Sequence, residues 1–402
     1  MRPWFVLLTI PCLACGSESQ ESAAFDRLTM IASEELRVGS PEDHEAAFTW
    51  FRQLEVGPDG TIFTAHPQES QIRVHDASGS FVGTIGRKGE GPGEFDRVGV
   101  MAIVGDTLWV LDHGLYRFSY FDLDGRLLGT RRIPVDLGDS PTDIPPRPRG
   151  LLRDGTIIGA PPAYSHMVAS GELTESYLVR MDTAGSTKDT IARYSLVNTT
   201  WEITNNERGP AYFGSYRRQP FSDTEIVAVS DYDMIAVRLN RAPPRPVDSA
   251  AFTVTAWRID GDTIFSHAFR YDPIPLRTAM VDSIIDGFAE SVANAEFLGG
   301  RATFEEAASW AREGLYLPLY HPPVSSLVIA SDGQLWLRAE ELGAPTVKWR
   351  ILSAKGDPVG FVALPSGFTM LYARGLQVWG TEYDELDVPY IVRYRITEEA
   401  DT

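Results

Sequence analysis

The 402-residue sequence has only two cysteines, and both lie within its first 15 residues. The rest of the chain therefore cannot form an internal disulfide bond or use a thiol in chemistry. Basic residues are scarce as well: 36 Lys and Arg face 55 Asp and Glu, for a formal net charge of −19. Such a charge repels phosphate backbones, so we expect no nucleic-acid partner.

Sequence motifs of common catalytic and metal sites are also missing. The glycine-rich run from 86 to 93 is not followed by Gly-Lys-Ser/Thr, and no Gly-x-Ser-x-Gly elbow occurs. Asp43-His-Glu45 lacks the second His of a zinc-protease motif, and Asp122-Leu-Asp-Gly125 lacks the remaining ligands of a calcium loop. We therefore expect no metal, no cofactor and no catalytic residue from these patterns.

The N-terminus has the features of an export signal. A basic start precedes an apolar run over residues 4–10 that is too short to span a membrane as a mature helix. It ends in Cys-Leu-Ala-Cys-Gly-Ser at 12–17, which resembles the lipobox of bacterial lipoproteins, although the position three before the acylated cysteine is usually Leu. The resemblance implies a signal peptide over 1–14, lipidation of Cys15 and a lipidated tether over 15–24.

These features predict that the protein is exported and lipid-anchored in the cell envelope, either on the periplasmic side or at the outer membrane. Secretion without an anchor is the alternative.

The remaining chain repeats a unit of about 45 residues with four short strands, which is typical of a β-propeller blade. Each unit alternates apolar and polar residues between turns rich in Gly and Asp. The turn between its first two strands recurs at Asp59-Gly60, Gly105-Asp106, Asp154-Gly155, Tyr232-Asp233, Asp332-Gly333 and Arg374-Gly375. The sequence therefore predicts an all-β, six-bladed β-propeller over residues 25–397, followed by an acidic tail over 398–402.

The last blade has too little sequence for its fourth strand. We expect residues 28–38 near the N-terminus to supply it, because strands from both ends of the chain would then close the ring and remove an open sheet edge.

One segment between the first two units carries a family resemblance. Gly89-Glu-Gly-Pro-Gly-Glu-Phe95, with Ile72-Arg-Val-His-Asp76 before it and Leu108-Trp-Val-Leu-Asp112 after it, resembles the repeat of NHL-type propellers. It is most similar to bacterial six-bladed propeller lipoproteins, strongly over about residues 50–130 and more faintly over 320–396. The resemblance implies the fold, but propellers serve as binding proteins, lyases, lactonases and scaffolds alike.

The long insertions fall on one face of the predicted propeller. Turns between the first and second strands, and between the third and fourth, lie on one face and are short. The other connections lie on the opposite face, which we call the loop face. They contain all the long insertions, at 134–149, 161–175, 198–220, 240–250, 276–318 and 339–346. Insertions confined to one face usually mark the binding surface, so we expect a ligand or partner there.

The insertion at 276–318, between blades four and five, is predicted to be helical. Apolar residues from Met280 to Val292 recur at helical spacing, and Thr303-Phe-Glu-Glu306 forms a capping box for a second helix. These helices are either a lid over the channel mouth or a packing element between blades.

Two histidines near the loop face are candidate ligand contacts. His66 ends the second strand of blade one, where the NHL-type repeat usually has Asp, and His113 follows the equivalent Asp112 in blade two. Asp112 itself is expected to close its turn through hydrogen bonds to backbone N–H groups.

Three arginines are the other candidates. Arg52, Arg147 and Arg149 lie at even offsets before their turns, so alternation places them on one side of the innermost strands, whereas Arg97 is out of register. They can hold an anion, or they can pair with carboxylates between blades.

The function expected from these patterns is binding of a protein or small molecule at the loop face, without catalysis. The alternative is a propeller enzyme, either a metal-dependent lactonase or hydrolase or a lyase, with its site at the channel mouth. Such enzymes carry Glu, Asn, Asp or His ligands on several inner strands. The predicted inner strands contain few carboxylates and no His, which favours binding.

Overall fold

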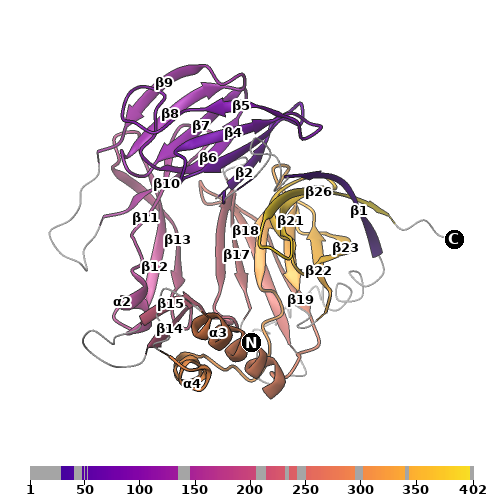
Figure 1. The fold of residues 1–402 in the computed structure, drawn as a ribbon. Helices are drawn as coiled ribbons and strands as arrows, with labels where there is room; N and C mark the ends of the chain where they lie inside the picture. The colour runs from indigo at the N-terminus through magenta and orange to yellow at the C-terminus, as the bar shows by residue number, and fades with distance from the viewer. Residues whose placement is uncertain are drawn as a thin grey trace, which may run out of the picture.

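The computed structural model describes residues 29–39, 48, 50–51, 53–134, 145–204, 214–230, 235–241, 250–294, 302–339 and 344–398. It confirms the predicted all-β fold, a six-bladed propeller of antiparallel four-stranded blades (Figure 1). The first strand of each blade lies innermost, beside the first strand of a neighbouring blade.

The first three blades follow the chain in order. Their strands are β2 (Gln53–Val56), β3 (Ile62–His66), β4 (Gln71–His75) and β5 (Phe81–Ile85); β6 (Val98–Val104), β7 (Thr107–Asp112), β8 (Arg117–Asp122) and β9 (Leu127–Arg132); and β10 (Arg147–Leu151), β11 (Ile157–Ala160), β12 (Glu175–Met181) and β13 (Thr187–Ser195).

The last three blades follow after a separate hairpin of β14 (Thr200–Thr204) and β15 (Gly214–Arg218). The strands of these blades are β16 (Ile226–Ser230), β17 (Ile235–Asn240), β18 (Ala251–Arg258) and β19 (Thr263–Arg270); β20 (Ser326–Ile329), β21 (Leu335–Ala339), β22 (Thr346–Leu352) and β23 (Pro358–Pro365); and β24 (Thr369–Arg374), β25 (Gln377–Tyr383), β26 (Pro389–Glu398) and β1 (Thr29–Val38). The predicted turn at 232–233 lies outside the described residues.

The N-terminal strand closes the ring as predicted. β1 pairs antiparallel with β26, from Met30 opposite Glu398 to Val38 opposite Ile391. Its first residues also pair in parallel with β23 of blade five, which the sequence did not indicate. This strand therefore joins the fifth and sixth blades into one sheet.

Apolar side chains fill the junctions between neighbouring blades, with one cluster at each junction. At the closing junction, Trp379 of β25 shares a cluster with Leu54 and Ile62 of blade one. Burial of each such side chain contributes about 1.5–3 kcal/mol, so the ring is held together mainly by contacts between blades.

The Asp and Gly residues that mark the turns have a direct structural role. In the turn between β4 and β5, Asp76 Oδ1 accepts hydrogen bonds from the backbone N–H groups of Ser78 (2.9 Å) and Ser80 (3.0 Å). Gly79 has a φ of 87°, and a Cβ at this position would lie 2.5 Å from Val38 of β1. Only glycine therefore suits both the conformation and the contact with the closing strand.

The insertion at 276–318 forms two helices, α3 (Thr278–Ala293) and α4 (Phe304–Gly314). The predicted capping box is present, with Glu306 N donating to Thr303 Oγ1 (3.2 Å) and Thr303 N donating to Glu306 Oε2 (2.8 Å). None of the described helices is long and apolar enough to cross a membrane.

The apolar stripe of α3 packs against the β14–β15 hairpin and α4, forming a small core of its own. Ile285 and Phe288 share this core with Trp201 and Ile203 of β14, and with Phe221 just beyond β15. Another loop-face insertion therefore provides the apolar surface on which the helices pack.

Candidate functional site

Three loop-face insertions meet around a cavity of about 510 Å³. We call it the insertion pocket. Figure 1 shows the contributing elements together at one end of the molecule: α2 (Ser165–Ala169), the β14–β15 hairpin and α4. The lining residues are Val168, Ala169, Gly171, Leu173, Thr174, Val197, Asn198, Thr200, Glu202, Thr204, Gln219, Trp310, Glu313, Gly314, Leu315 and Tyr316.

Alternation along β14 separates its two roles. Trp201 and Ile203 are buried in the core of the helical insertion, and Trp201 Nε1 donates a hydrogen bond to the Ala311 carbonyl of α4 (3.0 Å). The intervening Thr200, Glu202 and Thr204 line the pocket and are half-buried. One face of this strand therefore anchors the helices while the other face is available to a ligand.

Gln219 fixes the end of α4 to the hairpin. Its buried side chain donates from Nε2 to the Gly314 carbonyl (2.8 Å), and its Oε1 accepts from Tyr316 N (3.0 Å). A side chain at Gly314 would collide with the backbone carbonyl of Glu202, so glycine permits this close approach. These contacts hold one wall of the pocket in place without a bound ligand.

The pocket wall combines apolar and acidic groups. Leu173 and Leu315 provide apolar surface, while Glu202 and Glu313 provide carboxylates. The Tyr316 hydroxyl donates to Asp223 Oδ2 (3.3 Å). Burial raises the pKa of this hydroxyl, and the nearby Asp223 charge raises it further. Tyr316 is thus a neutral donor that already has an acceptor.

His66 lies in the packed interior of blade one. Its side chain is fully buried, Nε2 lies 3.0 Å from Thr64 Oγ1, and its ring is stacked on Phe48 at a centroid distance of 5.9 Å. Burial lowers the pKa of His66 to about 4. Solvent does not reach this side chain.

His113 is half-buried beside the inner strand of blade two. Its backbone N–H donates to the Arg97 carbonyl (3.0 Å), and a Cβ built on Gly99 of β6 would lie 2.9 Å from its ring. The missing side chain at Gly99 therefore leaves room for this imidazole.

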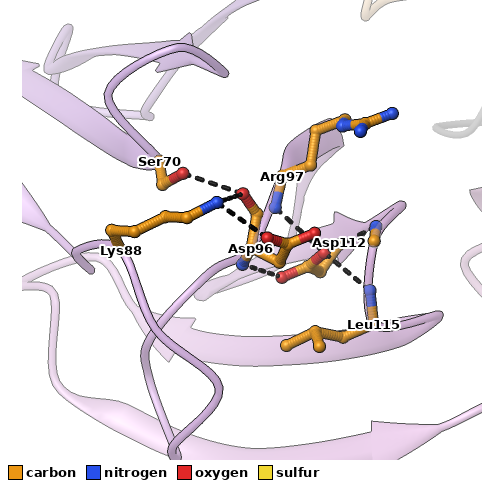
Figure 2. Close-up of polar contacts among 7 residues, drawn as sticks. Ser70, Lys88, Asp96, Arg97, Asp112 and Leu115 are labelled. Carbon is orange, nitrogen blue, oxygen red and sulfur yellow. Dashed lines mark hydrogen bonds and ion pairs between the residues drawn. The ribbon is translucent and has the colours of Figure 1, made fainter.

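Asp112 has the turn-closing role expected of it (Figure 2). Its two carboxylate oxygens accept hydrogen bonds from the backbone N–H groups of Asp96, Arg97, Gly114 and Leu115, at 2.7–3.2 Å. Lys88 Nζ contacts Asp96 Oδ1 (2.7 Å), and Ser70 Oγ donates to the Asp96 carbonyl (2.9 Å). The glycine-rich segment is therefore fastened between blades one and two as a structural connection.

Of the three candidate arginines, the structure describes two, Arg147 and Arg149. Arg52 lies outside the described residues. Arg147, the first residue of β10, is half-buried, and Arg149 is exposed. A β-bulge between Pro148 and Gly150 interrupts the alternation that would place these two side chains on the same side.

The pocket-lining side chains were not identified individually from the sequence. The only signal for them was that the insertions 161–175, 198–220 and 276–318 share one face. Within the described ranges, no group of three or more His, Cys, Asp or Glu side chains could hold a metal ion.

Comparison with known proteins supports the architecture. Residues 53–144 match the family described as "6-bladed beta-propeller". No curated protein matches the chain.

Solved structures similar to this chain include a member of the DUF4221 family from Bacteroides vulgatus, with 10% identity, a TM-score of 0.47, and coverage of 92% of this chain and 98% of that chain. Virginiamycin B lyase from Staphylococcus aureus has 11% identity, a TM-score of 0.40, and coverage of 90% and 99%, respectively. Similarities at this level transfer no activity or ligand to this chain.

Proposed function

We propose that this chain is a lipid-anchored binding protein of the cell envelope that holds a small molecule in the insertion pocket. The observation that supports this proposal is that three insertions, separated in sequence but confined to one face, border a cavity of about 510 Å³. This volume lies within the range of about 300–1,000 Å³ that is common for small-molecule sites. A cavity of this size favours a small ligand over a folded partner protein.

We also propose binding without catalysis. Gln219 and Tyr316, two polar residues of the pocket, make hydrogen bonds that position its walls. Walls that are held in place in this way suit the retention of a ligand in a preformed pocket.

Filling the pocket is expected to weaken ligand binding strongly while preserving the fold. Val168 lines the cavity, whereas the exposed Ser170 at the end of α2 does not. Val168→Trp places a large ring in the ligand space, and Ser170→Trp adds the same ring outside it. A metabolite library screened by thermal shift and confirmed by calorimetry should give ligands whose affinity falls at least about tenfold in Val168→Trp and is unchanged in Ser170→Trp.

Equal binding by Val168→Trp and wild type would contradict this site, provided that thermal melting shows the variant to be folded.

Replacement of the proposed lipidated cysteine is expected to release the protein from membranes. Cys15→Ser removes the thiol that would carry the acyl group, whereas Cys12→Ser leaves it in place. Metabolic labelling with a palmitate analogue should mark the wild type and Cys12→Ser but not Cys15→Ser, and membrane fractionation should follow the label. An unlabelled wild-type protein would disprove lipid anchoring.

A further inference from the structure

The charges around the insertion pocket define a ligand class. Two of its lining residues, Glu202 and Glu313, are carboxylates, and none of the described lining residues is Lys, Arg or His. Bringing an anion beside two carboxylates would be electrostatically unfavourable, whereas a cation would be attracted. The net charge of −19 on the whole chain acts in the same direction by attracting cations to the protein.

Glu202 has a carboxylate oxygen that can accept a hydrogen bond from a ligand. Its Oε1 accepts a hydrogen bond from the Tyr216 hydroxyl (3.1 Å), but its Oε2 accepts none from the described residues. The side chain is half-buried on the pocket face of β14, so an ion pair formed there would be partly shielded from water. A charged N–H donor is the partner that forms the strongest hydrogen bonds with such a carboxylate.

Part of the remaining wall suits an apolar body attached to that cation, beside the neutral polar side chains of Thr174, Asn198, Thr200 and Thr204. Val197, Leu173 and Leu315 contribute aliphatic surface, and Trp310 contributes an indole. Aromatic rings also attract cations through their π-electrons. Gln219 uses both ends of its amide to hold the end of α4, so its polar atoms are engaged by the protein.

We infer that the insertion pocket selects an organic cation, a primary amine or guanidinium compound with an apolar body, through Glu202. This inference rests on the proposed function, because it concerns the same cavity.

The test compares matched probes on the purified full chain by calorimetry. The probes are 2-phenylethylamine, its neutral counterpart 2-phenylethanol, and agmatine as a guanidinium compound. At least one of the two cations should bind about tenfold more tightly than the alcohol, and Glu202→Gln should remove that preference. Glu172→Gln is the control, since Glu172 is exposed in the same loop as Gly171 and Leu173 but does not line the cavity.

Three results would overturn the inference: failure of both cations to bind, equal binding of the alcohol, or an unchanged preference in Glu202→Gln. The Val168→Trp comparison distinguishes this failure from failure of the proposed function. Neutral or anionic library ligands that are lost in Val168→Trp would keep the pocket as the binding site while excluding its selectivity for cations.

Discussion

Deletion of residues 29–38 is expected to abolish the cooperative unfolding transition of the propeller. These residues form β1, which supplies the outer strand of the sixth blade and also pairs with β23 of the fifth. Without β1, β26 becomes an unpaired edge, and the apolar side chains beneath the strand become exposed. The truncated protein should aggregate or lose its sharp melting transition in calorimetry.

Two neighbouring residues of β1 provide a matched test of this explanation. Met30 is 6% exposed within the cluster between blades five and six, whereas Ile31 is 48% exposed on the opposite face. Met30→Ala should lower the free energy of unfolding by about 2–4 kcal/mol, and Ile31→Ala by less than about 1 kcal/mol. Urea titrations would measure both values.

An unchanged melting transition after the deletion would show that β1 is dispensable for the ring. Equal effects of Met30→Ala and Ile31→Ala would show that burial against the fifth and sixth blades is not the source of its stabilisation.

The blade pattern was predictable because its signals are local. Asp76 accepts hydrogen bonds from residues two and four positions ahead, and Gly79 supplies the positive φ of the same turn. A motif of this kind fixes its own geometry wherever it occurs in the chain. The closing strand was predictable for a related reason: the sequence after the first turn of the sixth blade is too short to contain the fourth strand.

The pocket depends on contacts that have no periodic signal. Gln219 meets Gly314 across a separation of 95 residues; Gln219 lies in an irregular segment and Gly314 is the last residue of α4, and both are outside the blades. Sequence placed both insertions on one face, but it could not show that one would provide the apolar support for the other. The parallel pairing of Thr29 and Met30 with β23 was unpredictable for the same reason.

His66 shows a different limit of sequence reasoning. Its position at the end of β3, the second strand of blade one, indicated a loop-face residue, but Phe48 from the segment before the first blade stacks on its ring. Burial therefore depends on a packing partner that the repeat pattern does not contain.

That burial leads to a second large expected effect, a loss of stability in mild acid. His66 and His75 are both fully buried, and Phe48 lies within 5.9 Å of one ring and 5.4 Å of the other. Desolvation lowers the pKa of each histidine from 6.5 to about 4. These pKa values already include smaller contributions from nearby charges: Glu69 raises that of His66, Arg73 lowers both, and Asp76 raises that of His75.

The sign follows from proton binding in the two states. Between pH 6.5 and about 4, the unfolded chain holds protons on these histidines and the folded chain does not, so the stability from their neutral forms is lost as pH falls. When the pH is lowered from about 7.5 to 5, proton uptake by each histidine in the unfolded chain should lower the free energy of unfolding by about 2 kcal/mol. Asp59 and Asp76, with pKa values lowered from 3.8, lose their contribution only in stronger acid.

His75→Leu should remove about half of this loss, because His75 is one of the two buried histidines that take up a proton. The fold should tolerate leucine, since neither ring nitrogen of His75 has a hydrogen-bond partner among the described residues and leucine has a similar volume. His166→Leu on the exposed face of α2 is the control and should retain the wild-type dependence on pH. Urea titrations at about pH 7.5 and 5 measure the difference in unfolding free energy. If His75→Leu lost as much stability as wild type over this interval, the buried imidazole could not be the group that takes up the proton.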